Sequence, residues 1–342
     1  MSIDDAAKAL FVPFVAGTLA VPAPGARILW GNARDVPDRA MLADCALTLQ
    51  QSFRPWALPL MRAGLNVDAD FTADKDYDAV LVCGRKQHEE NCALMAACLL
   101  RLKPGGIIVC AAENDAGGRR LAKDLAALGL QLESDSKYHC RIVYGVVDDF
   151  DRVLAQKWID DAGPQQKEID ATPTWTQPGL FGWDRLDKGS AFLLQHLPAT
   201  FKGKGADLGC GNGVLSRHLL RHNPGIKALT GLDADARAVA ATLQNIPDER
   251  ISARWVAVGT EVTGLENLDW VVMNPPFHQG SKTAIAEGIA FIKAAAQMMH
   301  TGGHLWMVAN AHLPYEAHIT TEFKRCDKIA EAHGFKIYCA VK

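Results

Sequence analysis

The sequence predicts an α/β protein with two tandem domains, each holding a mostly parallel, doubly wound sheet. The second half of the chain alternates apolar, strand-like runs with helical patterns, and the first half repeats this layout more faintly. Buried runs separated by helices are typical of parallel sheets that are covered on both faces. The length of 342 residues also fits two domains.

The second half supplies the clearest elements. Apolar runs predict strands at residues 205–208, 228–232, 254–258, 268–273, 304–309 and 336–341. Apolar residues at helical spacing predict helices at residues 212–222, 236–243 and 285–299. This order of strands and helices predicts one open sheet for the second half.

The first half echoes two of these segments at similar offsets. Residues 77–82 resemble residues 268–273, and residues 102–109 resemble residues 299–306. The echo favours a duplicated α/β unit, although any two α/β domains share some likeness at this level.

A polar stretch rich in proline, glycine and glutamine begins near residue 160 and is typical of a linker. It separates two apolar halves of similar size. We therefore expect one domain at residues 1–155, a linker at residues 156–178 and a second domain at residues 179–342.

The composition excludes several classes of protein. Hydrophobic residues make up 49% and charged residues 22%, and the formal net charge is −3. These values exclude a disordered chain, a collagen-like repeat and a coiled-coil rod. Neither half has a broad positive field, so contact with nucleic acid must rest on a local patch or on shape.

The cysteines and the apolar stretches indicate a cytoplasmic protein. Nine cysteines are spread singly, without a Cys-x-x-Cys pair. This spacing suggests neither a zinc site nor a disulfide framework, so we expect no metal and free thiols. The apolar stretch at residues 9–21 is short, contains Pro13 and follows two acidic residues. We therefore expect neither a signal peptide nor a membrane span.

A glycine-rich turn follows the first strand of the second half, at residues 207–213. Its glycines let the backbone turn sharply and approach a ligand. An NAD fingerprint would place glycine where Val214 stands, which weakens that interpretation. Instead, Asp207 can face a positively charged ligand end, such as the amino group of S-adenosylmethionine. Asp233 ends the second strand, where a carboxylate can accept hydrogen bonds from ribose hydroxyls. The predicted cofactor-binding residues are Asp207, Gly209, Cys210, Gly211, Gly213 and Asp233.

The segment Asn274-Pro275-Pro276-Phe277 follows the fourth strand and carries the predicted catalytic residues. The two prolines fix φ and stiffen the backbone. The Asn274 side-chain oxygen and the Pro275 carbonyl are two acceptors that can hold a flat NH2 group. Phe277 offers a ring face on which a planar base can stack. Accepting both hydrogens draws an exocyclic amine toward a tetrahedral nucleophile, so the segment predicts methyl transfer to such an amine.

Together these motifs resemble class I S-adenosylmethionine-dependent methyltransferases that act on planar amino groups. More narrowly, the chain resembles the tandem-domain bacterial 16S ribosomal RNA guanine-N2 methyltransferases in four segments, at residues 178–181, 186–190, 274–278 and 308–315. The resemblance is specific over residues 178–342 and architectural over residues 1–155. It implies two Rossmann-like methyltransferase domains, of which only the second binds S-adenosylmethionine.

The resemblance also implies a target, the exocyclic N2 amine of a guanine in small-subunit rRNA, within the small subunit or an assembly intermediate. The first domain would be a degenerate, non-catalytic copy that supports the second or holds RNA. Residues 28–34 lack the glycine pattern of a cofactor turn, and residues 83–86 stand where the Asn-Pro-Pro-Phe segment would. In a departure from the family, residues 258–260 offer no acidic group for the cofactor adenine.

Four further side chains are weaker candidates. Phe181 either covers the cofactor or base, or packs the linker onto the domain as a buried aromatic residue. His278, beside the site, is a candidate to assist proton loss. Arg217 and Arg221 lie four residues apart on one predicted helix and either contact RNA phosphate or form a solvated face.

The same motifs also fit other functions. The same chemistry serves a guanine in large-subunit rRNA, adenine N6 in DNA, or the N5 amide of a protein glutamine. A different class is a non-catalytic ribosome assembly factor that binds S-adenosylmethionine, which the intact Asn-Pro-Pro-Phe segment disfavours. An NAD oxidoreductase is the third class, weakened by Val214.

Overall fold

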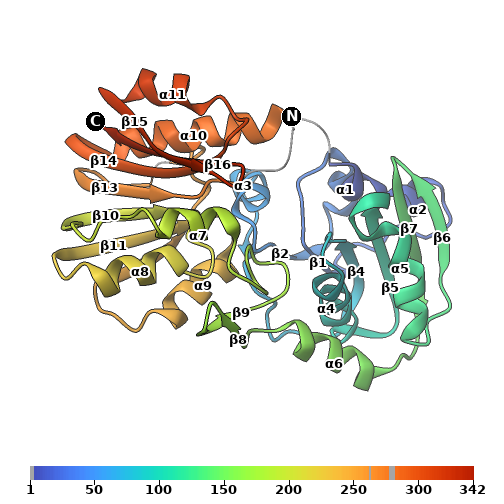
Figure 1. Cartoon of the computed structure of the whole chain (residues 1–342). Helices are drawn as coiled ribbons and strands as arrows, with labels where there is room; N and C mark the ends of the chain where they lie inside the picture. The colour runs from blue at the N-terminus through green and yellow to red at the C-terminus, as the bar shows by residue number, and fades with distance from the viewer. Residues whose placement is uncertain (1–3, 262, 277–281) are drawn as a thin grey trace. The chain divides into compact units, whose positions relative to one another are not determined.

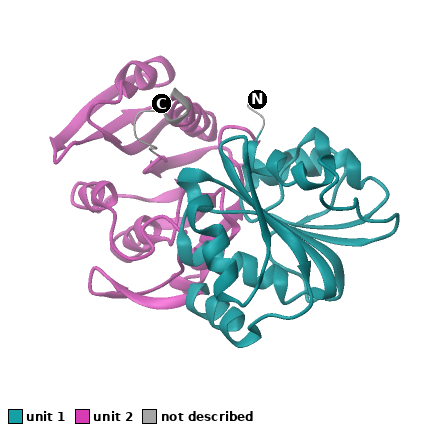
Figure 2. Cartoon of the chain, turned by 90° about the vertical axis from the view of Figure 1, so that its right-hand side faces the viewer, with its two compact units in different colours: residues 1–163 teal, residues 164–342 magenta. Residues whose placement is uncertain are grey.

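The computed structural model describes residues 4–261, 263–276 and 282–342. It divides the chain into two compact units, unit 1 at residues 1–163 and unit 2 at residues 164–342, which Figure 2 colours separately. The boundary falls within the segment predicted to be a linker, residues 156–178.

Unit 1 contains a seven-stranded sheet in the order β3-β2-β1-β4-β5-β7-β6 (Figure 1). The first five strands of this order are parallel, and β7 runs antiparallel to both β5 and β6. Its strands are β1 (Arg27–Gly31), β2 (Ala46–Gln50), β3 (Val67–Asp68), β4 (Tyr77–Cys83), β5 (Leu102–Glu113), β6 (Glu133–Lys137) and β7 (Cys140–Val147). Its helices are α1 (Asp5–Ala9), α2 (Val12–Val15), α3 (Arg54–Arg62), α4 (His88–Leu99), α5 (Arg119–Ala127) and α6 (Arg152–Ala162).

Unit 2 contains a second seven-stranded sheet, in the order β12-β11-β10-β13-β14-β16-β15, and a two-stranded hairpin, β8-β9. Its strands are β8 (Gln165–Ile169), β9 (Thr172–Thr176), β10 (Gly203–Leu208), β11 (Ile226–Asp233), β12 (Ile251–Trp255), β13 (Leu268–Met273), β14 (Met299–Asn310), β15 (Arg325–Ala332) and β16 (Phe335–Val341). Its helices are α7 (Lys188–Leu194), α8 (Val214–His222), α9 (Ala236–Asn245), α10 (Lys282–Met298) and α11 (Tyr315–Glu322).

The two large sheets have the same topology. Each strand of one order has a counterpart at the same place in the other, so β4 corresponds to β13 and β5 corresponds to β14. These are the segments whose sequences echo each other. The prediction of two mostly parallel α/β domains is confirmed, and the shared strand order supports the duplicated unit.

The side chains of β13 show why helices cover both faces of the second sheet. Successive residues of a strand point to opposite faces. Val271 and Met273 join a core with Ile292 of α10 and with residues of α11, whereas Trp270 and Val272 join a core with α8. All four strand residues are buried. A continuous apolar run thus gives a strand that is buried on both sides.

Several segments differ from the sequence-based expectation. The strand expected at residues 254–258 is β12, Ile251–Trp255. Residues 156–178 are regular rather than an irregular linker, since they contain most of α6 and both strands of the β8-β9 hairpin. The strand β15 was not expected, because it lies at the edge of the sheet and alternates charged and small residues instead of forming an apolar run.

Within the described part of the chain, no helix combines the length and the apolar character needed to span a bilayer. All nine cysteines are free thiols.

Candidate active site

The predicted motifs meet at the carboxyl ends of three neighbouring strands of unit 2. Leu208 of β10 pairs with Leu232 of β11 on one side and with Met273 of β13 on the other. The next residues along these chains bring the glycine turn, Asp233 and Asn274 to one edge of the sheet. A Cβ atom at Gly209 would lie 3.9 Å from the Asn274 backbone oxygen. This is the edge where open α/β sheets bind ligands.

The turn from β10 to α8 requires its glycines. Gly209, Gly211 and Gly213 all have left-handed backbones, with φ values of +75°, +56° and +83°. A side chain is strained in this conformation. Gly213 is also crowded, since a Cβ there would lie 3.1 Å from the Ile246 side chain. The turn is therefore a fixed backbone cradle at the start of α8.

Asp207 lies fully buried beneath this turn and does not line the pocket beside it. Its Oδ2 accepts a hydrogen bond from Ser216 Oγ at 2.7 Å, which ties the end of β10 to α8. Its Oδ1 is buried and has no hydrogen-bond partner among the described residues. Burial raises the pKa of Asp207 to about 7, and the nearby carboxylate of Asp233 acts in the same direction. An unpaired buried carboxylate oxygen fits a site that receives a cationic ligand.

Asp233 closes β11 beside the turn. Its Oδ2 accepts from the Gly211 backbone N–H, and its Oδ1 accepts from the Asp235 backbone N–H, both at 2.8 Å. Burial raises the pKa of Asp233 to about 6, against the lowering effect of these hydrogen bonds. Each carboxylate oxygen can accept more than one hydrogen bond, so Asp233 keeps acceptor capacity for ligand hydroxyls.

Asn274 is buried, and its amide is fixed by two residues of the α7 segment. Asn274 Nδ2 donates to Asp187 Oδ2 and to Ser190 Oγ, each at 2.9 Å. Because an ionised carboxylate only accepts hydrogen bonds, the NH2 group must face Asp187. Asn274 Oδ1 has no donor among the described residues and is left as an acceptor.

Asp187 and Ser190 are candidate positioning residues that no sequence motif had assigned to the site. Asp187 is the N-cap of α7, and its Oδ2 also accepts from the Ser190 backbone N–H at 2.9 Å. The capping motif was visible in the sequence as Asp followed by Ser three residues later. Its contact with a side chain 87 residues away was not.

A small pocket that is open to solvent joins these elements. Its wall includes Asn274, Asp187 and Ser190, together with the turn residues Gly209 to Asn212. Cys210 also lines it, but burial raises the pKa of its thiol well above the ordinary value, so it is not a thiolate nucleophile. The pocket thus places one fixed acceptor beside the glycine cradle.

The structure describes some of the remaining predicted site residues and not others. Phe181 lines the pocket and is 61% exposed, so the alternative of a buried aromatic residue packing the linker is wrong. Pro275 is buried and Pro276 is exposed. Phe277 and His278 lie outside the described residues.

A second, basic hollow adjoins the pocket. The two share Leu186 and Val214, and the second is lined by four side chains of α8, which are Arg217, His218, Arg221 and His222. Burial and the neighbouring Arg221 lower the pKa of Arg217, and burial and His222 lower that of His218. The two arginines disfavour each other's charge, so an anion between them would be favourable.

In unit 1, the place equivalent to the glycine turn is filled by polar side chains of the unit itself. Asn32 follows β1, and its polar groups are hydrogen-bonded within the unit. Its backbone N–H donates to Gln50 Oε1 at 3.0 Å, and its Nδ2 donates to the Cys83 carbonyl at 2.8 Å. Gln51 Nε2 donates to Asn32 Oδ1 at 3.1 Å. These buried groups satisfy one another, in contrast to Asp207.

Comparisons with known proteins show the family of the chain. A family model described as methyltransferase small domain matches residues 172–339. The chain is 33% identical over 269 residues to the ribosomal RNA small subunit methyltransferase C of Pseudomonas paraeruginosa, covering 77% of this chain and 79% of that one. It is 31% identical over 324 residues to the protein of the same name from Salmonella choleraesuis, covering 92% of both chains.

The fold also matches a solved structure over its whole length. A T. thermophilus 16S rRNA N2 methyltransferase, in complex with AdoMet and guanosine, aligns with a TM-score of 0.81 at 21% identity. The alignment covers 99% of this chain and 92% of that chain. Fold and site together define a methyltransferase. The chain belongs to the ribosomal RNA small subunit methyltransferase C family.

Proposed function

We propose that this protein transfers a methyl group from S-adenosylmethionine to the exocyclic N2 amine of a guanine in small-subunit rRNA. The substrate is the small subunit or one of its assembly intermediates, and the reaction takes place in the cytoplasm. Unit 2 carries the activity, and unit 1 is a non-catalytic copy. The family to which the chain belongs supports the target class.

The observation that carries the proposal is the fixed amide of Asn274. With both Nδ2 hydrogens held by Asp187 and Ser190, Asn274 Oδ1 is a preorganised acceptor in the pocket wall. An acceptor fixed before the substrate arrives does not have to reorganise during the reaction. A guanine N2 amine presents two hydrogens, and the Pro275 carbonyl is proposed to accept the second.

The chain's own residues would act by positioning. When bound, S-adenosylmethionine supplies an electrophilic methyl group on a sulfonium sulfur. Asn274 and Pro275 hold the amine so that its lone pair leaves conjugation with the ring and points along the line of attack. Phe277 is proposed to stack on the guanine. No metal is required, since the sulfonium methyl is already activated.

The glycine cradle and the two carboxylates fit the cofactor. Gly209, Gly211 and Gly213 keep the turn free of side chains, and Asp233 retains capacity to accept hydrogen bonds from ribose hydroxyls. Asp207 lies one layer deeper, so we propose that it acts on the cationic end of the cofactor by its charge beneath the turn. Cys210 contributes a small, buried side chain to the pocket wall.

The basic hollow beside the pocket is a proposed contact for the RNA backbone. Its arginines and histidines come from α8, the helix that begins at the cofactor turn. A phosphate there would relieve the mutual repulsion of Arg217 and Arg221. This local patch would let a chain with a formal net charge of −3 bind RNA.

The proposal is tested by nucleoside analysis of rRNA from cells that lack the gene. We expect N2-methylguanosine to decrease in 16S rRNA and to return when the wild-type gene, but not Asn274→Ala, is supplied. A decrease confined to large-subunit rRNA would show that the target lies in that rRNA. An unchanged N2-methylguanosine content in both rRNAs would refute the activity. Restoration by Asn274→Ala would instead favour a non-catalytic assembly factor.

A further inference from the structure

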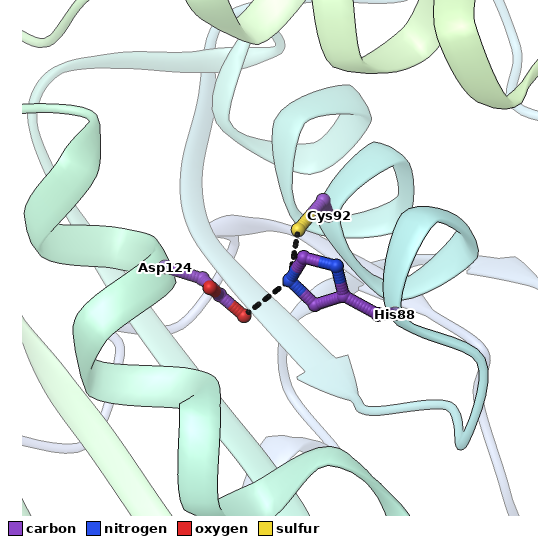
Figure 3. Close-up of side chains that lie close together, drawn as sticks. All are labelled: His88, Cys92 and Asp124. Atoms are coloured by element: carbon purple, nitrogen blue, oxygen red, sulfur yellow. Dashed lines mark hydrogen bonds and ion pairs between the residues drawn. The ribbon is translucent and has the colours of Figure 1, made fainter.

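We propose that His88, Cys92 and Asp124 form a binding site for one zinc ion in unit 1. His88 and Cys92 lie one turn apart on α4, and Asp124 lies on α5. Their ligand atoms all lie within 4.8 Å of one another. Figure 3 shows the imidazole of His88 between the thiol and the carboxylate.

One ring nitrogen of His88 faces two hydrogen-bonding partners. His88 Nε2 lies 3.1 Å from Asp124 Oδ2 and 3.4 Å from Cys92 Sγ, so both partners converge on one ring nitrogen. In a neutral imidazole, that nitrogen carries either one hydrogen or one lone pair. It cannot both donate to the carboxylate and accept the thiol proton. A cation in contact with all three groups satisfies each of them.

The same convergence argues against a catalytic Cys-His-Asp relay. In such a relay the carboxylate and the nucleophile bind opposite nitrogens of the imidazole. Here both contacts involve Nε2. The arrangement therefore suits coordination rather than proton transfer along the ring.

The donor set and the spacing favour zinc. One nitrogen, one sulfur and one oxygen suit Zn²⁺ and do not suit Mg²⁺ or Ca²⁺, which take oxygen ligands. Ordinary zinc–ligand bond lengths in a tetrahedral site place the ligand atoms about 3.3–3.6 Å apart. His88 Nε2 lies 3.1 Å from Asp124 Oδ2 and 3.4 Å from Cys92 Sγ, within a few tenths of an ångström of this range, and the third pair of ligand atoms lies within 4.8 Å.

The burial of the three side chains agrees with a three-ligand site. Cys92 and Asp124 are buried, whereas the His88 side chain is 40% exposed and leaves a fourth position for water. Arg120 Nη2 lies 3.6 Å from Asp124 Oδ1, so the carboxylate presents its other oxygen, Oδ2, to His88. Because zinc binds the thiolate and not the thiol, zinc binding must release the Cys92 thiol proton to solvent.

Such an ion would link α4 to α5 and stabilise unit 1. The expectation of no metal rested on the missing Cys-x-x-Cys spacing. That criterion does not detect a His–Cys pair four residues apart on one helix that is completed by an aspartate from another helix. The inference does not depend on the methyl transfer proposed for unit 2.

The test is zinc binding by the purified full chain after removal of metal with a chelator. Titration against a chromophoric zinc chelator should give one zinc per chain, with release of about one proton per ion. Cobalt(II) should give a thiolate-to-metal charge-transfer absorption. Cys92→Ala and His88→Gln should abolish both signals, and Asp124→Asn, which keeps the side-chain shape, should weaken binding at least tenfold.

Matched controls are Cys45→Ser and His139→Asn, which lie outside the cluster and should bind zinc like the wild type. Circular dichroism and cofactor binding by unit 2 check that each variant is folded. Failure of the wild type to bind one equivalent, or binding that survives in all three cluster variants, would overturn the site. Methyl transfer is measured separately, so its failure would leave the zinc result unaffected.

Discussion

The amide of Asn274 donates through Nδ2 to the carboxylate of Asp187, with 2.9 Å between Nδ2 and Oδ2. The same carboxylate oxygen caps α7. A local helix-capping residue thus determines which way the amide of the proposed catalytic residue points, and Asn274 Oδ1 is left for the substrate.

Asp187 should act as a positioning residue. Asp187→Ala frees the amide of Asn274, and we expect kcat to fall on the order of 100-fold with little change in KM. Asp187→Asn should recover most of the activity, because its side-chain oxygen can accept from Nδ2 and asparagine is also a good N-cap. Steady-state kinetics of both variants check this. Equal loss in both variants would indicate that Asp187 matters only for folding.

Removing the acceptor itself should be more severe. We expect Asn274→Ala to lower kcat by about 10²–10³-fold, the usual cost of losing one preorganised hydrogen-bonding group. Cofactor affinity, measured by calorimetry, should stay nearly unchanged, since the glycine turn and Asp233 are intact. Normal turnover in this variant would contradict the assigned role.

Asp207 should make the ligand-free protein less stable as pH rises from about 4 to 7. Its pKa is raised to about 7 in the folded protein from an ordinary value of 3.8, so in this range the folded state binds more protons than the unfolded state. Asp233, with a pKa raised to about 6, contributes in the same direction.

Thermal unfolding between pH 5 and 8 measures this effect. Asp207→Asn should lose less stability than the wild type as pH rises to 7. Asp248→Asn serves as the control, because the Asp248 pKa, held at about 2 by Arg250, lies below this range. Saturating S-adenosylmethionine should also reduce the wild-type loss, since a cationic ligand favours the ionised carboxylate. Parallel curves for wild type and Asp207→Asn would refute the assignment.

The basic hollow should contribute to RNA binding through charge. Arg221→Ala should weaken RNA binding and lower the slope of log affinity against log salt by about 1. Arg325→Ala, on the exposed edge strand β15, is the matched control and should leave the slope unchanged. Filter binding across a range of salt concentrations measures this slope. An unchanged slope for Arg221→Ala would exclude this surface as a contact for RNA phosphate.

The sequence predicted the parts of the fold that depend on hydrophobic periodicity. The run at residues 268–273 became β13 because its buried residues face helices on both sides. The hairpin β8-β9 escaped prediction, since its turn uses Asp170 and Ala171 in left-handed conformations, with φ values of +50° and +53°. Such turns are usually marked by Gly or Asn.

In the site, too, local patterns were predictable from the sequence and contacts between distant residues were not. The glycine turn, Asp233 and Asn274 were predictable because strand ends at one edge of a parallel sheet lie together. The roles of Asp187 and Ser190 depend on a side-chain contact between distant segments, which no local pattern reveals. Likewise, Asp207 proved to lie beneath the turn rather than in the pocket wall, because the turn folds over the end of β10.

The most direct test of the central claim is transfer of radiolabelled methyl from S-adenosylmethionine to purified ribosomal subunits. Small and large subunits from a strain lacking this gene are incubated with the protein, and the labelled nucleosides are identified. The account predicts label as N2-methylguanosine in the small subunit. Label in the large subunit only, or in neither subunit while the protein still binds the cofactor, would contradict it.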